Sequence, residues 1–287
     1  MRNLLSTVAK VLDHDVPVLI RGESGTGKDY LAEAIHACSA RRSEPFVHVD
    51  CATIPPDLFE SELFGYERGT FTDAVARRLG RLELAKSGAV YFDNIDTLSP
   101  TLQAKLLRVL QDKTFTRLGG SQNVEFNARV LSSVSGDLDA LMASGAFRRD
   151  LYYRINVVTV TLPPLRERRD DILSLAQGFA GKREFDESAS TLLTSHAWPG
   201  NVRELRNAIE RAALMNPAGT IAADSLPLSG SEFVAAAARG HWTLDELESN
   251  YIRAVLRETR SNYSRAAEIL GINRKTLLEK RRKYGLE

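Results

Sequence analysis

A glycine-rich segment contains the most specific chemical pattern in the chain. It reads Gly-Glu-Ser-Gly-Thr-Gly-Lys from Gly22 to Lys28. Glycines let backbone N–H groups turn inward around phosphate oxygens, and a helix that starts at the lysine adds the positive end of its dipole. The Lys28 ammonium is expected to reach the β- and γ-phosphates. The pattern predicts binding of a nucleoside triphosphate, with contacts from Gly22, Ser24, Gly25, Thr26, Gly27 and Lys28.

Two carboxylates are placed to serve a metal ion beside the phosphates. Asp29 follows the lysine at a position where this pattern normally has the hydroxyl of Ser or Thr, which binds Mg²⁺. A carboxylate serves the metal directly or through water. The apolar run Ala89-Val-Tyr-Phe-Asp93 ends in a second carboxylate, as expected of an aspartate at the carboxyl end of a sheet strand. Asp29 and Asp93 are therefore predicted Mg²⁺ ligands.

The elements that must position these residues alternate between strand and helix. Apolar runs predict strands at Val16–Ile20, Phe46–Val49, Ala89–Phe92 and Ala128–Ser133, with helices between them, the first at Asp29–Ala40. This alternation favours a parallel sheet with helices on both faces, a three-layer αβα domain. After Pro163-Pro164 the periodicity is helical only, at Asp170–Gly181, Glu187–Ser195 and Val202–Met215, which predicts a small helical domain. A helix from Thr243 to Thr259 and two shorter helices close the chain.

Charge and composition bound the class of protein. The 287 residues carry a net charge of only +1, but residues 261–287 hold seven basic and three acidic side chains. A basic end of this kind indicates nucleic acid as a partner, and a solvated helix face is the alternative. Cys38 and Cys51 have neither metal-ligand nor disulfide spacing, as is typical of a reducing compartment. Without a membrane-length apolar run or a signal peptide, we expect a soluble cytoplasmic protein with no membrane partner.

Five blocks in order resemble the AAA+ domain of bacterial enhancer-binding proteins, the activators of sigma-54 RNA polymerase. They are residues 22–29, Ser61-Glu-Leu-Phe-Gly65, Phe147-Arg-Arg-Asp-Leu151, residues 162–168 and Trp198-Pro-Gly-Asn-Val-Arg-Glu-Leu205. The family has an acidic residue after the phosphate-loop lysine, as Asp29 is here. The resemblance implies an α/β AAA+ domain over 1–165, a helical lid over 166–227, a linker over 228–242 and a helix-turn-helix domain over 243–287. The chain begins slightly inside the usual AAA+ start, and we expect no amino-terminal sensory domain.

The resemblance also implies residues for hydrolysis, and here the sequence departs from the family. A glutamate that polarises the attacking water is expected after Asp93, but this residue is Asn94. An amide cannot accept a proton as a general base, and losing a positioned base costs about 10²–10⁴ in rate. Asp50 stands where the family usually has an asparagine that holds this glutamate. Either Asp50 retains a carboxylate near the water and allows slow hydrolysis, or the catalytic site has simply decayed.

Further residues match the family's nucleotide sensors. Ser135 stands at the end of the sensor strand, where the family prefers asparagine, and its side chain has a shorter reach. Arg148 and Arg154 match two arginines that act on the γ-phosphate of a neighbouring subunit, which implies a hexameric or heptameric ring. Surface arginines on an exposed helix are the alternative. Arg203 matches the lid arginine that touches nucleotide phosphate.

A loop that contacts the sigma factor is also altered. The family motif Gly-Ala-Phe-Thr-Gly-Ala corresponds to Gly69-Thr-Phe-Thr-Asp-Ala74. Phe71 and Thr72 are retained as predicted polymerase contacts, whereas Asp73 replaces a glycine and Thr70 an alanine. Aspartate tolerates positive φ less well than glycine and adds charge. Together with Asn94, these changes indicate a member that has left sigma-54 activation.

The basic end resembles the Fis-type helix-turn-helix. Ala266, Ala267, Leu270, Ile272 and Leu277 are expected to close a small core. The start of the second helix is expected in the major groove of double-stranded DNA, and later basic residues on phosphate. The predicted contacts are Asn273, Arg274, Lys275, Thr276, Lys280 and Arg281, with Lys283 beside them. Glu279 stands where such helices often have a basic residue. The helix 243–259 is the expected dimer surface, and a basic hairpin that binds another protein is the alternative.

Three functions remain open at this point. The first is a DNA-bound regulator of RNA polymerase whose ATP-bound state controls assembly, with weak or absent hydrolysis and a polymerase form other than sigma-54. The second is an active ATPase that remodels sigma-54 polymerase. The third is a binding module whose altered pocket or ring interface takes another ligand, such as a cyclic dinucleotide.

Overall fold

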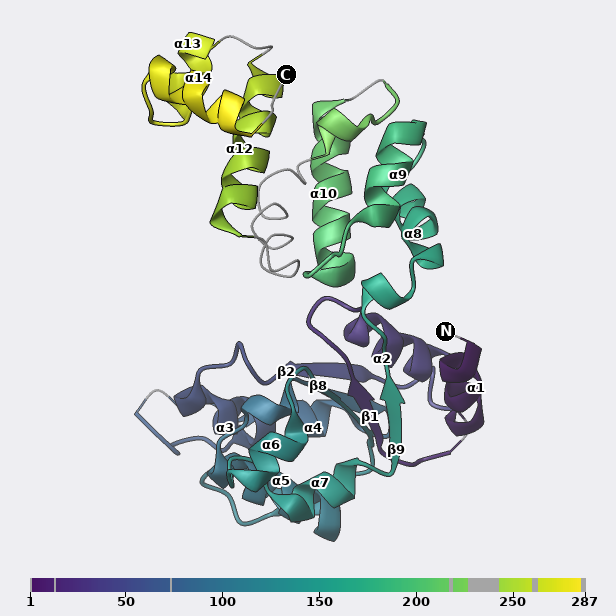
Figure 1. Ribbon diagram of the computed structural model, residues 1–287. Coiled ribbons are helices and arrows are strands. Elements are labelled where there is room, and N and C mark those ends of the chain that lie inside the picture. Colours follow the sequence, from purple (N-terminus) through teal and green to yellow (C-terminus); the bar gives the residue numbers. More distant parts are fainter. Residues whose placement is uncertain are drawn as a thin grey trace. The chain divides into compact units, whose positions relative to one another are not determined.

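The chain divides into two compact units, Met1–Ser225 and Leu226–Glu287. The computed structural model describes residues 2–12, 14–72, 74–216, 219–226, 243–259 and 263–284 (Figure 1). Asp73 and the predicted linker, residues 228–242, therefore lie outside the described residues.

A five-stranded parallel sheet forms the centre of the first unit. Its strand order is β2-β5-β8-β1-β9. The strands are β1 (Val18–Arg21), β2 (Phe46–Asp50), β5 (Ala89–Asp93), β8 (Arg129–Val134) and β9 (Val158–Thr161). Four of them follow the predicted apolar runs, and β9 was not expected because its residues alternate between apolar and polar. The predicted three-layer αβα fold is confirmed.

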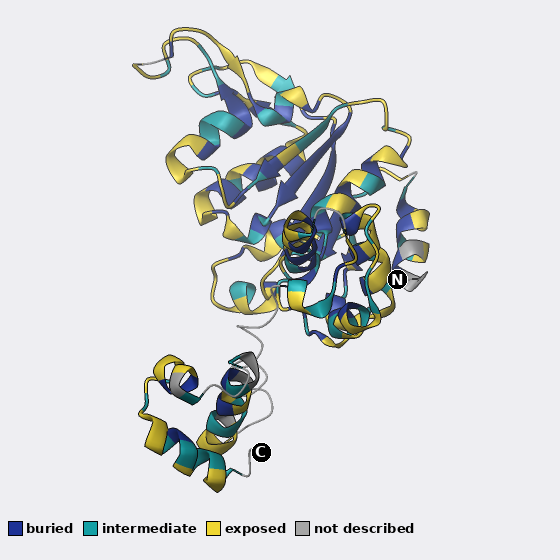
Figure 2. Ribbon diagram, turned by 90° about the horizontal axis from the view of Figure 1, so that it is seen from above, coloured by how far each residue is buried: buried dark blue, intermediate teal, exposed yellow. Residues whose placement is uncertain are grey.

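Helices cover both faces of the sheet because successive strand residues point to opposite sides. Val18 and Ile20 pack with α1 (Arg2–Val11) and α2 (Lys28–Ala37), whereas Leu19 packs into the opposite layer. That layer contains α3 (Pro56–Phe64), α4 (Arg81–Leu84), α5 (Pro100–Asp112), α6 (Leu138–Ala143) and α7 (Arg149–Ile155), with the 3₁₀ turn η1 at Ile95–Thr97. Figure 2 shows the strands buried between helices with exposed outer faces.

Two short hairpins extend from the sheet and were not predicted. One pairs β3 (Gly65–Tyr66) with β4 (Arg78–Leu79), and the other pairs β6 (Thr114–Thr116) with β7 (Asn123–Glu125). The hairpins contact each other, because the Glu67 N–H donates to the Leu118 carbonyl at 3.0 Å and the Leu118 N–H donates to the Gly65 carbonyl at 3.0 Å. The segment 69–74 therefore begins at a fixed base.

Three helices form the predicted small helical domain. They are α8 (Asp170–Ala180), α9 (Glu187–Ser195) and α10 (Asn201–Met215), with 3₁₀ turns at η2 (Leu165–Glu167) and η3 (Ala223–Ser225). Trp198 is fully buried, and its indole N–H donates to the Leu193 carbonyl at 2.9 Å. This bond fixes the segment that leads from α9 into α10.

The second unit is a helix-turn-helix with one supporting helix. It consists of α12 (Leu244–Glu258), α13 (Tyr263–Ile269) and α14 (Arg274–Lys283). Ile252 and Val255 pack with Ala266, Ala267 and Leu277, so the predicted core is present. Gly271 has a φ of +65° at the turn between α13 and α14, a conformation that favours glycine. Across the residues described in both units, no helix has the length and apolarity needed to cross a membrane.

Candidate nucleotide and metal site

The glycine-rich segment is the turn between β1 and α2, as predicted. β1 ends at Arg21 and α2 begins at Lys28. Gly25 and Gly27 have φ of +77° and +99°, which only glycine adopts at little cost. A Cβ at Gly25 would also lie 2.3 Å from the Gly200 carbonyl oxygen, so this position packs directly against the segment that leads into α10. The sequence therefore produces a turn whose backbone can surround a phosphate.

Lys28 is buried at the start of α2, with 6% of its surface exposed. Its ammonium donates to the carbonyl oxygens of Gly22 and Glu23 at 3.0 and 3.2 Å and to the Ser135 hydroxyl at 2.7 Å. Burial lowers the pKa of Lys28, while the nearby carboxylates of Asp93 and Asp29 act in the opposite direction. All three donors of the ammonium thus have partners that phosphate oxygens can replace.

The two predicted metal ligands lie on either side of a tyrosine hydroxyl. The Tyr91 hydroxyl oxygen lies 2.8 Å from Asp29 Oδ1 and 3.1 Å from Asp93 Oδ1. The Ser133 hydroxyl also donates to Asp93 Oδ1. Burial and the two carboxylates raise the pKa of Tyr91, so the hydroxyl keeps its proton. Two carboxylates this close to one hydroxyl are oxygen donors of the kind that suits Mg²⁺. When bound, Mg²⁺ would supply positive charge beside the phosphates.

Both ends of the Asn94 side-chain amide form hydrogen bonds. Its Nδ2 donates to Asp93 Oδ2 at 3.0 Å, and its Oδ1 accepts from the Ser135 hydroxyl at 3.1 Å. The backbone is in the left-handed region with φ of 53°, and its N–H donates to the Ser133 hydroxyl at 3.0 Å. A continuous chain of hydrogen bonds therefore runs from Lys28 through Ser135 and Asn94 to Asp93.

Asp50 lies beside this chain of bonds without joining it. The strand register places Asp50 opposite Asp93 at the ends of β2 and β5. Asp50 Oδ1 accepts the Ala52 N–H at 2.9 Å, within its own turn. Among the described residues, no hydrogen bond connects the Asp50 carboxylate with the Asn94 amide. The structure thus brings the carboxylate to the neighbouring strand end and turns it toward its own loop.

Three residues at the start of α10 contact the glycine-rich turn. Arg203 Nη1 donates to the Ser24 hydroxyl at 2.9 Å, as expected of a residue near the phosphates. The N–H groups of Val202 and Arg203 donate to the Gly25 carbonyl at 2.9 and 3.3 Å. The fully buried Asn201 donates from Nδ2 to the Ser24 carbonyl at 3.0 Å and to Glu23 at 3.1 Å. Its Oδ1 accepts from the Leu165 N–H at 2.8 Å.

An ion pair that sequence reasoning missed reinforces this contact. The Arg166 guanidinium donates both to Glu23 Oε2 at 2.8 Å and to Glu23 Oε1 at 2.6 Å. Its hydrogen bonds, and that from Asn201, lower the pKa of Glu23 to about 2. Nearby, Arg168 donates to the Thr26 carbonyl at 2.7 Å. Arg166 and Arg168 belong to the family-like block of residues 162–168, but their partners Glu23 and Thr26 lie in a distant part of the sequence.

The two arginines with a predicted role between subunits are bound within their own chain. Arg148 forms a two-bond ion pair with Asp150, at 3.0 and 2.7 Å. Arg154 donates twice to the Leu110 carbonyl, at 3.2 and 2.8 Å. Both side chains are exposed. A role on a neighbouring subunit would therefore require each guanidinium to leave these partners.

The predicted polymerase-contact loop is attached to the neighbouring hairpin. Phe71 is 44% exposed, and its ring contacts Tyr66 edge to face with centroids 4.8 Å apart. Thr72 is exposed. Below the loop, the buried Arg117 guanidinium forms ion pairs with Glu83 at 2.7 Å and Glu67 at 2.9 Å. The aromatic side chain is thus presented on a base held by buried charges.

In the second unit, the start of α14 presents exposed basic residues. Arg274 and Lys275 are exposed, and the Asn273 side chain accepts the Thr276 N–H at 2.8 Å, which stabilises the first turn of the helix. Lys280 instead pairs with Glu248 at 2.6 Å, and Lys283 pairs with Asp245 at 2.8 Å. Arg281 lies over the Tyr263 ring. The predicted DNA contacts therefore separate into an exposed group at the helix start and a group that packs on neighbouring helices.

Comparison with known proteins agrees with this architecture. A model of the sigma-54 interaction domain matches residues 1–161, a model of the AAA+ ATPase lid domain matches residues 166–240, and a model of the Fis family of bacterial regulatory proteins matches residues 243–284. The regulatory protein AtoC of Escherichia coli is 41% identical over 306 residues, covering 100% of this chain and 66% of AtoC. The Nif-specific regulatory protein of Azotobacter vinelandii is 48% identical over 238 residues, covering 80% of this chain and 46% of that protein.

Solved structures show the same fold. A crystal structure of NtrX from Brucella abortus in complex with ATP is 36% identical, with a TM-score of 0.73, over 100% of this chain and 68% of NtrX. Hsp104 of S. cerevisiae, at 16% identity and a TM-score of 0.54, shares the fold. The chain spans about two thirds of the length of AtoC and less than half of the Nif-specific regulator. The chain belongs to the family of sigma-54-dependent transcriptional regulators, with a sigma-54 interaction domain, an AAA+ lid and a Fis-type helix-turn-helix.

Proposed function

We propose that this chain is a DNA-bound transcription regulator that binds ATP and hydrolyses it weakly or not at all. ATP binding is supported by the glycine-rich turn, by the satisfied but replaceable bonds of Lys28 and by the ATP complex of the similar protein NtrX. Ser24, Thr26 and Arg203 line the same turn. The domain boundaries that accompany this proposal are 1–165, 166–227, 228–242 and 243–287.

We base the proposal of weak or absent hydrolysis on the position of Asn94. Its amide occupies the position next to Asp93, and the bonds to Asp93 and Ser135 fix both ends of that amide. Hydrolysis needs a group that accepts a proton from water, and an amide does not. Asp50, the carboxylate at the end of the neighbouring strand, accepts the Ala52 N–H instead. Asp29 and Asp93 would hold Mg²⁺, which supplies charge without supplying this base.

Steady-state ATP turnover tests the proposal. We expect the wild type to bind ATP in calorimetry and to turn it over at background rate, and Asn94→Glu to raise turnover by about 10²-fold or more. Asp50→Ala tests whether Asp50 allows slow hydrolysis or the catalytic site has decayed. The substitution lowers a slow wild-type turnover rate only if Asp50 assists hydrolysis. A wild type that already turns over rapidly, and that Asn94→Glu does not accelerate, contradicts the proposal. Calorimetry with a cyclic dinucleotide in place of ATP tests the alternative ligand.

The proposed partners are double-stranded DNA, RNA polymerase holoenzyme and further copies of the chain. The helix start at Arg274 and Lys275 supports DNA binding, and α12 supplies the proposed pairing surface of a dimer. Arg148 and Arg154 would act between subunits of a hexameric or heptameric ring. Hydrolysis-independent action at a polymerase form other than sigma-54 follows from Asn94 and from the altered loop 69–74.

The match to the sigma-54 interaction domain favours a second function, the remodelling of sigma-54 polymerase. Residues 1–161 match the sigma-54 interaction domain, and Phe71 is exposed in the loop that would contact the sigma factor. The alternative is therefore an active ATPase that remodels sigma-54 polymerase. Transcription in vitro with purified sigma-54 holoenzyme and with a holoenzyme containing another sigma factor separates the two. ATP-dependent activation of the sigma-54 form alone, abolished by Phe71→Ala, supports the alternative.

A further inference from the structure

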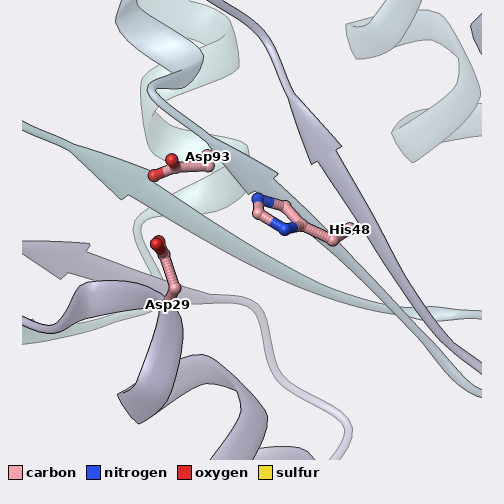
Figure 3. A group of neighbouring side chains, drawn as sticks. All are labelled: Asp29, His48 and Asp93. Carbon is pink, nitrogen blue, oxygen red and sulfur yellow. The ribbon is translucent and has the colours of Figure 1, made fainter.

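Three potential metal ligands converge from three different elements beside the glycine-rich turn. Asp29 comes from α2, His48 from β2 and Asp93 from β5 (Figure 3). One ligand atom of each residue lies within 4.8 Å of the others. His48 stands opposite Tyr91 in the register of β2 and β5, and because Tyr91 and Asp93 are two residues apart on β5, His48 and Asp93 lie on the same face of the sheet. We propose that Asp29, His48 and Asp93 form a site for a divalent transition-metal ion, which binds without nucleotide.

The charge balance of the pocket favours a cation. Two carboxylates share the Tyr91 hydroxyl, at 2.8 and 3.1 Å, and one hydroxyl proton can serve only one of them at a time. The Lys28 ammonium interacts with both carboxylates through its charge, but its hydrogen bonds go to two carbonyls and to Ser135. Neighbouring carboxylates destabilise each other when both are ionised. A divalent ion between them removes this repulsion.

The imidazole selects the class of ion. Mg²⁺ takes oxygen ligands in a strict octahedron, whereas Zn²⁺ and other later first-row ions combine imidazole nitrogen with carboxylate oxygen. Two aspartates and one histidine are three protein ligands, the number that leaves a coordination position for water or a phosphate oxygen in zinc sites. The site would therefore take an ion such as Zn²⁺ or Co²⁺ and still have room for a nucleotide.

Metal binding requires the three ligand atoms to approach one another. A tetrahedral ion with bonds of about 2.0–2.2 Å holds its ligand atoms roughly 3.3–3.6 Å apart, so ligand atoms as far as 4.8 Å apart must close by about an ångström. His48 is exposed on an edge strand, where its ring contacts Tyr91 with centroids 5.1 Å apart. Asp93 is buried and further held by Ser133 and Asn94. The exposed imidazole can therefore move toward the fixed carboxylate.

Cobalt titration of the full chain without nucleotide tests the site. Visible absorption of bound Co²⁺ reports ligand geometry, and calorimetry with Zn²⁺ and Mg²⁺ compares the two classes of ion. We expect Co²⁺ and Zn²⁺ to bind more tightly than Mg²⁺ and His48→Gln to weaken them at least about tenfold, since even supporting residues of metal sites contribute this much. His14→Gln is the matched control, because His14 is also exposed. Imidazole NMR should show the His48 ring nitrogens shifting on addition of Zn²⁺.

The proposal shares Asp29 and Asp93 with the proposed nucleotide site, but the two fail separately. Wild-type chain that binds ATP with Mg²⁺ and shows no Co²⁺ absorption overturns the metal site alone. Equal Co²⁺ affinity in the wild type and in His48→Gln, or equal loss in His14→Gln, also overturns it. His48→Asn is a second variant, and circular dichroism confirms that each variant is folded. Loss of ATP binding with retained Co²⁺ binding would contradict the proposed function instead.

Discussion

The hydroxyl oxygen of Thr70 lies 3.0 Å from the Leu118 carbonyl oxygen, which joins the loop 69–74 to the hairpin of β6 and β7. The same hydroxyl lies 2.6 Å from the Glu67 carbonyl. A Cβ at Gly119 would come within 2.3 Å of Thr70 Oγ1, so the two segments are in close contact. The alanine that the family has at this position lacks the hydroxyl. Thr70 therefore anchors the loop that displays Phe71.

Thr70→Ala should loosen this loop. Losing one neutral hydrogen bond costs about 1 kcal/mol, which corresponds to a roughly fivefold larger equilibrium constant for loop opening. Amide hydrogen exchange at Gly69 and Ala74, whose N–H groups donate within the loop, measures the change. Thr72→Ala is the matched control because Thr72 is exposed. Equal protection in the wild type and in Thr70→Ala would show that the hydroxyl does not anchor the loop.

The ion pair between Arg166 and Glu23 should make the contact of the helical domain depend on pH. The pKa of Glu23 is about 2, well below its ordinary value, so the pair is fully effective above the pKa of the unfolded chain. Its contribution is lost as pH falls from about 4.5 toward 2. Because both side chains are more than 40% exposed, solvent limits that contribution to about 1 kcal/mol or less.

Urea unfolding of the wild type and of Glu23→Gln between pH 3 and 7 measures this dependence. The stability difference should be largest near neutral pH and shrink toward acid. Glu33→Gln, at an exposed position of α2, should show no such trend. A difference that grows toward acid would contradict the assignment of Glu23 as the titrating group.

Arg129 should be a major contributor to stability. The buried guanidinium donates to the carbonyl oxygens of Val11, Leu12 and Val16, at 2.7, 3.1 and 3.3 Å, and so satisfies the end of α1. Arg129→Ala should lower the free energy of unfolding by about 3 kcal/mol, since charged hydrogen bonds are lost and carbonyls are left without partners. Chemical denaturation checks this value. The exposed Arg108, changed to Ala, should alter stability by less than about 0.5 kcal/mol.

Basic residues of α14 should differ in their effect on DNA binding. Lys275 is exposed, whereas the charge of Lys280 is balanced by Glu248 at 2.6 Å. Lys275→Ala should weaken binding by about 1–3 kcal/mol if it reads a base, and should reduce the salt dependence if it meets phosphate. Lys280→Ala should change both quantities less. Fluorescence anisotropy against salt, with an operator selected in vitro, compares them. Equal losses for the two variants would contradict the separation of these residues.

Much of the nucleotide site could be predicted because its signals are local in sequence. Gly22–Lys28 follows a short apolar run, and Asp93 ends another, so both turns lie at the same edge of a parallel sheet. The helices of the lid and of the second unit were found because their apolar residues recur with helical spacing. β9 was missed since only alternate residues of this edge strand are buried, although its β-branched residues were a usable signal.

Contacts between distant segments could not be predicted in this way. Glu23 and Asn201 are separated by 178 positions, and nothing in either segment indicates their partner. The direction of the Asp50 carboxylate depends on the Ala52 N–H in its own turn rather than on the adjacent strand. The approach of His48 to the carboxylates depends on the register of β2 against β5. Periodicity predicts which elements form, whereas register and side-chain rotamers decide which groups meet.

The bond from the Val202 N–H to the Gly25 carbonyl has a consequence for the lid. Gly200, the residue before α10, offers no side chain to cap the helix, so the glycine-rich turn supplies the acceptor that this helix otherwise lacks. The first turn of α10 is thus capped by a carbonyl oxygen of the α/β domain. A ligand that changes the conformation of the glycine-rich turn therefore changes how often this first helical turn opens. Hydrogen exchange at Val202 and Arg203 is therefore an internal reporter of whether the pocket is occupied.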